Sequence, residues 1–277
     1  MKIIECPRDA MQAIKNFIPT EKKILYINQL LKVGFDTIDF GSFVSPKSIP
    51  QLKDTAIVIE GLELDNTSSK LLAIIANIRG AADACAFQEI NYLGFPLSVS
   101  EIFQKRNTNK SIDQALNNIE KIHNLCINNQ KDLVVYLSMA FGNPYNEIYH
   151  PDIVAELTDR LFNLGIRIVA LSDTIGIAHS ENISQLFSVL ISEYPQIEFG
   201  AHFHTTKDSW EKKIQVAFQN GCQRFDGALR GYGGCPMAND ELVGNMPTEY
   251  LLSHFAKDLS INYEELEVSL SMTKSIF

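Results

Sequence analysis

The sequence repeats one unit, a helix that ends at a glycine and leads into a strand. Helical patterns end at Gly34, Gly165 and Gly221, and an apolar stretch of strand length follows each glycine within a few residues. Glycine is favoured just past a helix C-terminus because it adopts left-handed backbone angles without steric cost. Regular alternation of helices and strands predicts a parallel sheet covered by helices.

Eight strand-like segments alternate with helical patterns along the 277 residues, which is about 35 residues for each unit. This predicts the α/β class and a (β/α)8 TIM barrel, a fold that typically takes about 250 residues. An open doubly wound sheet is the alternative. Residues 262–277 are expected to form an extra C-terminal helix outside the barrel. We expect residues 1–277 to form a single catalytic domain. The expected strands are 2–6, 35–43, 70–76, 91–97, 132–141, 167–171, 196–204 and 224–229.

Composition excludes several classes of partner. Hydrophobic residues make up 45% of the chain and charged residues 21%, with no apolar run long enough to span a membrane. The net charge is −9, and no Lys/Arg stripe is interleaved with aromatic residues, so neither a membrane nor a nucleic acid is expected as a partner. Five cysteines lack any C-x-x-C spacing, and the N-terminus lacks a signal-peptide core. We therefore expect a cytoplasmic protein with free thiols.

Two histidines mark the end of the seventh expected strand. Because side chains alternate along a strand, His202 and His204 point to the same face with Cα atoms roughly 6.5 Å apart. Two imidazoles at that spacing can bind one metal ion. The carboxyl ends of strands are also where α/β barrels keep their catalytic groups.

Polar residues follow the other expected strands in the same way. They are Arg8, Asp9 and Gln12 after the first strand, Asp39 near the end of the second, Asp173 after the sixth, and Cys235 and Asn245 after the eighth. Because these strand ends meet at one mouth of a barrel, we expect the side chains to lie close together.

One carboxylate and two imidazoles, from Asp9, His202 and His204, can hold a divalent cation with positions left for substrate. If Asn245 adds an amide oxygen, the ligand set favours Mg²⁺ or Mn²⁺ over a structural Zn²⁺. The alternative interpretation is that Asp9 pairs with Arg8 and the histidines only pack.

Cys235 lies in a loop that contains Gly231, Gly233 and Gly234. Glycines allow backbone conformations closed to other residues, so such a loop can move and bring the thiol to a substrate for proton transfer. The alternative is a tight turn with an incidental cysteine.

Five motifs together resemble 3-hydroxy-3-methylglutaryl-CoA lyase, a family of metal-dependent TIM barrels. The resemblance implies cleavage of an acyl-CoA substrate at a carbon–carbon bond, a homodimer, and a divalent cation bound by Asp9, His202, His204 and Asn245. It also implies that Arg8 stabilises a thioester enolate, that Cys235 transfers a proton, and that Gln12, Lys15, Asp39, Asp173 and Glu249 support the substrate or the loop. The motifs are Pro7-Arg8-Asp9 with Gln12, Ser42 to Lys47, Asp173-Thr174-Ile175-Gly176, His202 with His204, and Gly233-Gly234-Cys235-Pro236 through Gly244-Asn245.

The chain departs from the family pattern at four places. Asp39 stands where the family has Glu, Thr205 replaces an Asp, Cys6 replaces a Gly, and the loop from Cys235 to Asn245 is one residue longer. The metal set is intact, so these changes bear on the acyl group that the site accepts.

The expected chemistry is a retro-Claisen cleavage. The cation acts as a Lewis acid on a substrate hydroxyl and lowers its pKa. When the hydroxyl has lost its proton, the alkoxide becomes a ketone, the adjacent C–C bond breaks, and an acetyl-thioester enolate is left. That enolate needs a positive charge beside its oxygen and a proton on its carbon. Two alternatives stay open: a condensing synthase or aldolase acting on a 2-oxo acid, and a catalytically silent barrel that only binds an acyl-CoA or a metal.

Overall fold

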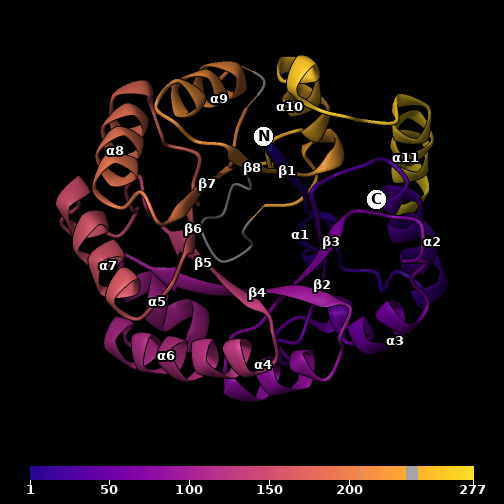
Figure 1. Cartoon of the computed structure of the whole chain (residues 1–277), viewed down its shortest axis with the longest axis horizontal. Coiled ribbons are helices and arrows are strands. Elements are labelled where there is room, and N and C mark those ends of the chain that lie inside the picture. Colours follow the sequence, from indigo (N-terminus) through magenta and orange to yellow (C-terminus); the bar gives the residue numbers. More distant parts are fainter. Residues whose placement is uncertain (207, 235–242) are drawn as a thin grey trace.

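The computed structural model describes residues 1–206, 208–234 and 243–277. Eight parallel strands pair in chain order and close into a barrel, with helices arranged around it (Figure 1). Closure comes from β8 pairing with β1, where Lys2 lies opposite Arg224 and Ile4 opposite Asp226. The prediction of a (β/α)8 barrel is therefore confirmed, and the open sheet is excluded.

The strands and helices follow the predicted alternation. The strands are β1 (Lys2–Glu5), β2 (Thr37–Ser42), β3 (Lys70–Ile74), β4 (Ile90–Ser98), β5 (Asp132–Ser138), β6 (Ile168–Asp173), β7 (Glu198–Phe203) and β8 (Arg224–Gly227). The helices are α1 (Pro7–Gln12), α2 (Thr20–Leu31), α3 (Thr55–Glu60), α4 (Ile78–Cys85), α5 (Glu101–Thr108), α6 (Ile112–Asn128), α7 (Pro151–Asn163), α8 (Ser180–Glu193), α9 (Trp210–Gln219), α10 (Thr248–His254) and α11 (Tyr263–Ile276).

Three helices were not predicted from the sequence. They are α1 and α3, of six residues each, and α5, of eight. Each has at most about two turns, which is too short for a 3.6-residue periodicity to stand out. The fifth strand also ends at Ser138 rather than at Phe141.

The interior of the barrel has an apolar half and a charged half. Buried residues on β3 to β6 form a small cluster of Leu72, Ile74, Tyr92, Val134, Tyr136 and Ala170. On the opposite side, β7 and β8 place Glu198, His202, Arg224 and Asp226 inside, at alternate positions along each strand. A charged interior is unusual for a fold whose central layers are mostly branched aliphatic side chains.

The predicted C-terminal helix is present as α11 and packs on α2. Gln29 on α2 donates a hydrogen bond to the Glu265 carboxylate at 2.7 Å. The last residue, Phe277, stacks on Tyr232, with ring centroids 4.6 Å apart, and so connects the C-terminus to the segment that follows β8. No helix within the described ranges combines the length and the apolar character needed to cross a membrane.

Candidate functional site

The short helix α1 carries three of the predicted site residues. Pro7 occupies its first turn, where the missing N–H is not needed, so the chain turns into a helix directly after β1. Arg8 and Gln12 are four positions apart and Asp9 and Gln12 three, so they share one helix face. The Gln12 amide accepts from Arg8 Nη1 at 3.0 Å and donates to Asp9 Oδ1 at 2.5 Å.

Arg8 places a buried positive charge beside the predicted metal ligands at this mouth of the barrel. Its Nε donates to Asp39 Oδ2 at 2.9 Å, its Nη2 to the same oxygen at 2.5 Å, and its Nη1 to Asp9 Oδ1 at 2.9 Å. The guanidinium is thus held by two carboxylates from different elements. Asp9 pairs with Arg8 as the alternative interpretation anticipated, but it also faces the two histidines.

Asp9, His202 and His204 form a group able to hold a metal ion. One ligand atom from each lies within 4.8 Å of the other two, and all three residues are buried or nearly so. Carboxylate oxygen and imidazole nitrogen are ordinary ligands of divalent metals. The three predicted protein ligands, on α1, on β7 and directly after β7, therefore fit a cation.

Asn245 is brought to the same place by the return of the chain after β8. His204 and Asn245 form an antiparallel bridge, and Met246 N–H donates to the Phe203 carbonyl at 3.1 Å. The Asn245 amide nitrogen lies 2.6 Å from Asp9 Oδ2. A Cβ on Gly233 would come within 2.8 Å of that nitrogen and 2.7 Å of the Asp9 carbonyl oxygen, so only glycine allows this approach. The Asn245 side chain thus lies beside Asp9 through its amide nitrogen, and its role as a metal ligand stays a prediction.

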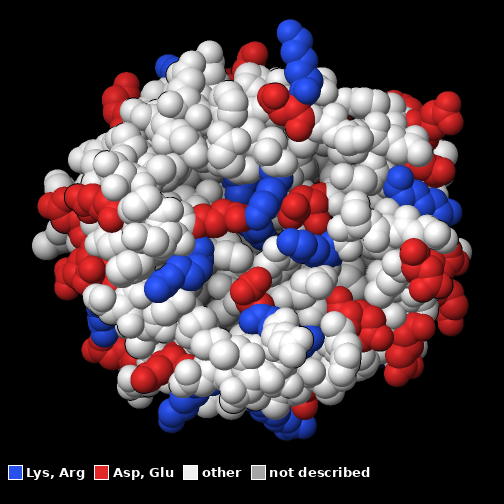
Figure 2. All heavy atoms as spheres, viewed as in Figure 1, with Lys and Arg blue, Asp and Glu red and all other residues white. Residues whose placement is uncertain are grey.

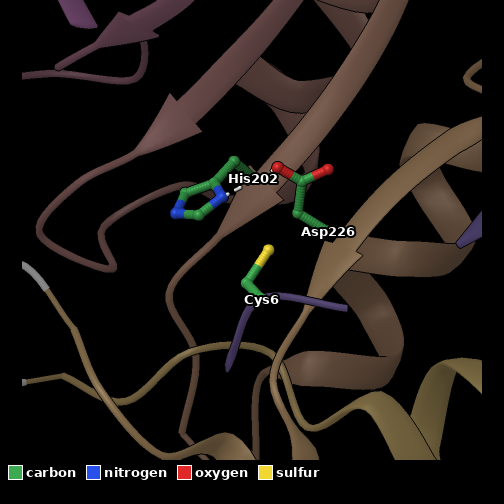
Figure 3. A group of neighbouring side chains, drawn as sticks. All are labelled: Cys6, His202 and Asp226. Atoms are coloured by element: carbon green, nitrogen blue, oxygen red, sulfur yellow. Dashed lines mark hydrogen bonds and ion pairs between the residues drawn. The ribbon is translucent and has the colours of Figure 1, made fainter. Parts of the chain in front are cut away.

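His202 is oriented from below by Asp226. Nδ1 of His202 lies 3.0 Å from Asp226 Oδ2, which leaves Nε2 for a metal (Figure 3). Metal-binding histidines commonly donate their other ring N–H to a carboxylate in this way. Cys6 also lies within ligand distance of this pair. Because His202 Nδ1 is already paired with the Asp226 carboxylate, the group of Cys6, His202 and Asp226 is a weaker candidate for a cation than the group of Asp9, His202 and His204.

The local electrostatics favour metal-binding protonation states at two of the three residues, His204 and Asp9. Burial and the neighbouring His202 lower the pKa of His204 to about 4. Burial opposes the charge of Asp9, but Arg8 and the histidines outweigh it and lower the pKa of Asp9. A neutral imidazole and an ionised carboxylate are the forms that bind a divalent cation.

Asp39 and His202 have pKa values raised above their usual range. Burial raises the pKa of Asp39 to about 6, although Arg8 lowers it. For His202, burial lowers the pKa, and the hydrogen bond from its ring to Asp226 more than offsets this. Asp39 lies beside Arg8 and the predicted metal ligands, and His202 on β7 is itself one of those ligands.

Asp173 serves as a buried anchor in this structure. Its Oδ2 accepts from Lys213 Nζ at 2.5 Å and its Oδ1 from the Ala178 N–H at 3.1 Å. The same ammonium group donates to the His204 carbonyl at 2.9 Å. The pair therefore joins the ends of β6 and β7 to α9. Sequence reasoning missed Lys213, although a lysine on the apolar face of that helical pattern was a usable signal.

The remaining predicted residues lie around this centre or outside it. Glu249, at the start of α10, accepts a hydrogen bond from the Arg230 backbone N–H at 2.9 Å, next to the loop after β8. Lys15 is exposed after α1 and makes no ion pair within the described ranges. Cys235 lies outside the described residues. Acidic and basic side chains gather near the centre of the face seen in Figure 2.

Comparison with protein families gives a match to the HMGL-like model over residues 2–267. Among curated proteins, the chain is similar to hydroxymethylglutaryl-CoA lyase YngG of Bacillus subtilis, with 33% identity over 94% of this chain and 87% of the relative. It is also similar to the mitochondrial hydroxymethylglutaryl-CoA lyase of Bos taurus, with 32% identity over 96% of this chain and 82% of that one.

Solved structures give the same result. An HMG-CoA lyase from Acinetobacter baumannii, in complex with coenzyme A and 3-methylmalate, superposes with a TM-score of 0.91 at 29% identity, covering 100% of this chain and 90% of that one. The HMG-CoA lyase of Bacillus subtilis superposes with a TM-score of 0.91 at 32% identity, covering 99% and 92%.

Proposed function

The chain belongs to the HMGL-like family, and from that premise we propose that it cleaves 3-hydroxy-3-methylglutaryl-CoA to acetyl-CoA and acetoacetate. The observation that carries the proposal is the group of Asp9, His202 and His204 placed directly beside Arg8. In the reaction the tertiary hydroxyl loses its proton, the adjacent C–C bond breaks as the ketone forms, and the thioester enolate gains a proton on carbon.

Asp9, His202, His204 and Asn245 would hold a divalent cation, which we propose to be Mg²⁺ or Mn²⁺ because half of the set is oxygen. When bound, the cation supplies Lewis acidity toward the substrate hydroxyl. The protein's part is to keep the ligands in place, through Gln12 on Asp9 and Asp226 on His202.

Arg8 is the residue that suits the enolate oxygen. Its guanidinium is fixed by Asp39 and Asp9 before substrate binds, so little reorganisation is needed when negative charge develops. Asp39 is one methylene shorter than the family's Glu, yet it reaches Arg8 at full hydrogen-bonding distance. We therefore propose that Asp39 acts on the substrate mainly by positioning Arg8.

We assign supporting roles to the outer residues. Asp173 supports the metal site through Lys213, which also binds the His204 carbonyl. Glu249 supports the loop after β8, and Lys15 contributes positive charge near the mouth for the acyl-CoA. Cys235, on that loop, is proposed to protonate the enolate carbon.

The decisive experiment is incubation of the metal-loaded protein with 3-hydroxy-3-methylglutaryl-CoA, with acetyl-CoA and acetoacetate measured. Formation of both in equal amounts supports the proposal. Condensation of acetyl-CoA with a 2-oxo acid, without cleavage of any 3-hydroxyacyl thioester, would identify a synthase instead. Absence of both reactions would leave a binding protein.

Two further proposals concern the state of the protein in the cell. We propose a homodimer, to be checked by light scattering during size-exclusion chromatography. We also place the protein in the cytoplasm, where the four described cysteines, all free thiols, would stay reduced. Fractionation of the source cells tests this directly.

A further inference from the structure

Arg224 is a fully buried cation inside the barrel, directly below the metal site. It shares the inner face of β8 with Asp226, two residues further on, because alternate residues of a strand face the same side. Its neighbour across the strand pair is Gly200 on β7. A Cβ at that position would come within 3.0 Å of Arg224 Cδ, so the glycine makes room for the arginine stem.

The register row that contains Arg224 and Gly200 continues through β6 to Tyr136 on β5. Tyr136 pairs with Ala170 and Ala170 with Gly200, so only small side chains stand between the tyrosine and the arginine. Four buried polar atoms gather in this part of the interior without a hydrogen-bond partner in the described chain. They are Tyr136 Oη, Arg224 Nε, Arg224 Nη2 and Asp226 Oδ1.

Buried polar atoms without partners are costly, and native interiors satisfy them with ordered water when the site is polar enough. Arg224 supplies donors, Asp226 an acceptor, and Tyr136 both. The group can therefore complete its hydrogen bonds through shared water. Burial disfavours the Arg224 cation, yet the carboxylates of Asp226 and Glu198 outweigh it and raise the pKa of Arg224.

At its lower end, the arginine is tied to the base of the barrel. Arg224 Nη1 donates to Glu198 Oε1 at 3.2 Å, and the other oxygen of Glu198 accepts from Lys2 Nζ at 2.5 Å. At the upper end, Asp226 Oδ2 pairs with His202 Nδ1 at 3.0 Å. Lys2, Glu198 and Arg224 are thus linked below and Asp226 and His202 above, while no direct hydrogen bond joins Arg224 to Asp226 among the described residues. We call these five residues the charged column (Lys2, Glu198, Arg224, Asp226, His202).

We propose that Arg224 is a positioning residue for the metal centre: through its charge and through water shared with Asp226 Oδ1, it orients the Asp226 carboxylate inside the barrel, so that Asp226 keeps the proton of His202 on Nδ1 and Nε2 faces the metal. This inference rests on the proposed function only for the presence of a metal at Asp9, His202 and His204. Groups behind a metal ligand typically contribute 10- to 100-fold to metal affinity.

The test measures Mn²⁺ binding by calorimetry on metal-stripped protein. Arg224→Met is expected to weaken binding about 10-fold or more, and Arg224→Lys, which keeps the charge, to recover part of the loss. Lys131→Met is the matched control, because Lys131 is another buried cation but binds the carbonyls of Phe87 and Ile90 at the opposite end of the barrel. It should leave Mn²⁺ affinity unchanged.

A second readout needs no metal. Long-range ¹⁵N spectra of histidine-labelled protein, with the His202 signal assigned by its loss in His202→Asn, are expected to show the Nδ1–H tautomer in the unmodified chain and a mixture in Arg224→Met. If Arg224→Met does not fold, Arg224→Gln, which keeps length and polarity without charge, is measured in its place.

The proposal is overturned if folded Arg224→Met or Arg224→Gln binds Mn²⁺ as tightly as the unmodified chain and keeps the same tautomer. It is equally overturned if Lys131→Met weakens binding as much. Failure of the unmodified chain to bind Mn²⁺ would instead remove the proposed metal centre itself.

Discussion

Arg8 and Asp39 form an ion pair at the mouth of the barrel, with Nη2 of the arginine 2.5 Å from Oδ2 of the aspartate and both side chains buried. The cation comes from the helix after β1 and its counter-ion from the adjacent strand β2. Because the guanidinium is already desolvated and oriented, it can meet developing negative charge without waiting for solvent to reorganise. This pre-orientation leads to a first prediction.

Replacing Arg8 by Lys keeps the positive charge but loses the planar fork that binds Asp39 and Asp9 together. We expect kcat for thioester cleavage to fall by about 10²- to 10³-fold, the usual loss when a charge-stabilising donor is removed. Mn²⁺ affinity should change far less. Steady-state kinetics and calorimetry measure the two effects, and the same exchange at exposed Arg79 serves as the control. Unchanged kcat in Arg8→Lys would remove Arg8 from the reaction.

The Asp173–Lys213 pair predicts a stability effect. Lys213→Met leaves the Asp173 carboxylate buried without its partner, which typically costs about 3–5 kcal/mol. The double variant Asp173→Leu with Lys213→Met removes both charges and should recover much of that loss, as measured by urea denaturation. If Lys213→Met were as stable as the unmodified chain while substrate affinity fell, Asp173 would be a substrate ligand rather than an anchor.

The sequence was sufficient for the barrel because its signals are repetitive and local. Each glycine after a helix and each apolar strand predicts one unit, and eight such units leave few other arrangements. The short helices α1, α3 and α5 escaped detection because one or two turns hold too few residues for a period to show. Closure of the barrel depends on the pairing of β8 with β1, two strands that lie more than 200 residues apart in sequence. From the sequence, this closure could be inferred only from the number of repeated units.

Part of the candidate site could also be predicted from the sequence. Asp9, His202, His204 and Asn245 follow strand ends, so their convergence could be anticipated. Asp226, Arg224 and Lys213 could not be placed, since each lies within a strand or helix and acts through a partner from another element. A buried charge in an apolar pattern was the available signal in each case, but only the fold shows which opposite charge it meets.

Metal removal gives a third prediction. Treatment with a chelator is expected to abolish thioester cleavage, and Mg²⁺ or Mn²⁺ to restore it. The cation should also stabilise the fold, because a ligand at 100 times its Kd adds about 2.7 kcal/mol to the unfolding free energy. Thermal denaturation with and without Mn²⁺ measures this shift, and Asp9→Asn should lose most of it. Full activity in metal-free protein would contradict the assignment of the site.

Cys235 provides a fourth prediction, made from the sequence alone. If its thiol donates the proton to the enolate carbon, Cys235→Ala should lower kcat by about 10²-fold or more, which corresponds to roughly 3 kcal/mol. Metal content should stay the same, since the thiol is not a proposed ligand. Turnover and bound metal are measured on one sample. Normal turnover would make Cys235 a turn residue, and loss of metal would make it a ligand.

Glu5 connects the segment that follows β8 with the start of α10. Its side chain is completely buried on the outer face of β1. One carboxyl oxygen accepts a hydrogen bond from the Leu229 N–H, just after β8, at 3.0 Å. The other oxygen pairs with Thr248 Oγ1, the first residue of α10, at 2.5 Å. Burial raises the pKa of Glu5 to about 8, although both hydrogen bonds oppose the shift. The neutral acid is therefore the form that the fold accommodates.

This raised pKa predicts a pH dependence of stability. Between pH 5 and 8, the unfolded chain has lost the Glu5 proton and the folded chain keeps it, so unfolding releases a proton and the folded state loses stability as pH rises, by up to about 1.4 kcal/mol per pH unit. Glu5→Gln is neutral at every pH and keeps both hydrogen bonds. Its stability relative to the unmodified chain should therefore increase from pH 5 to pH 8 in urea denaturation. Glu264→Gln, which removes an exposed carboxylate, is the control. Parallel pH profiles for Glu5→Gln and the unmodified chain would show that Glu5 is ionised in the fold.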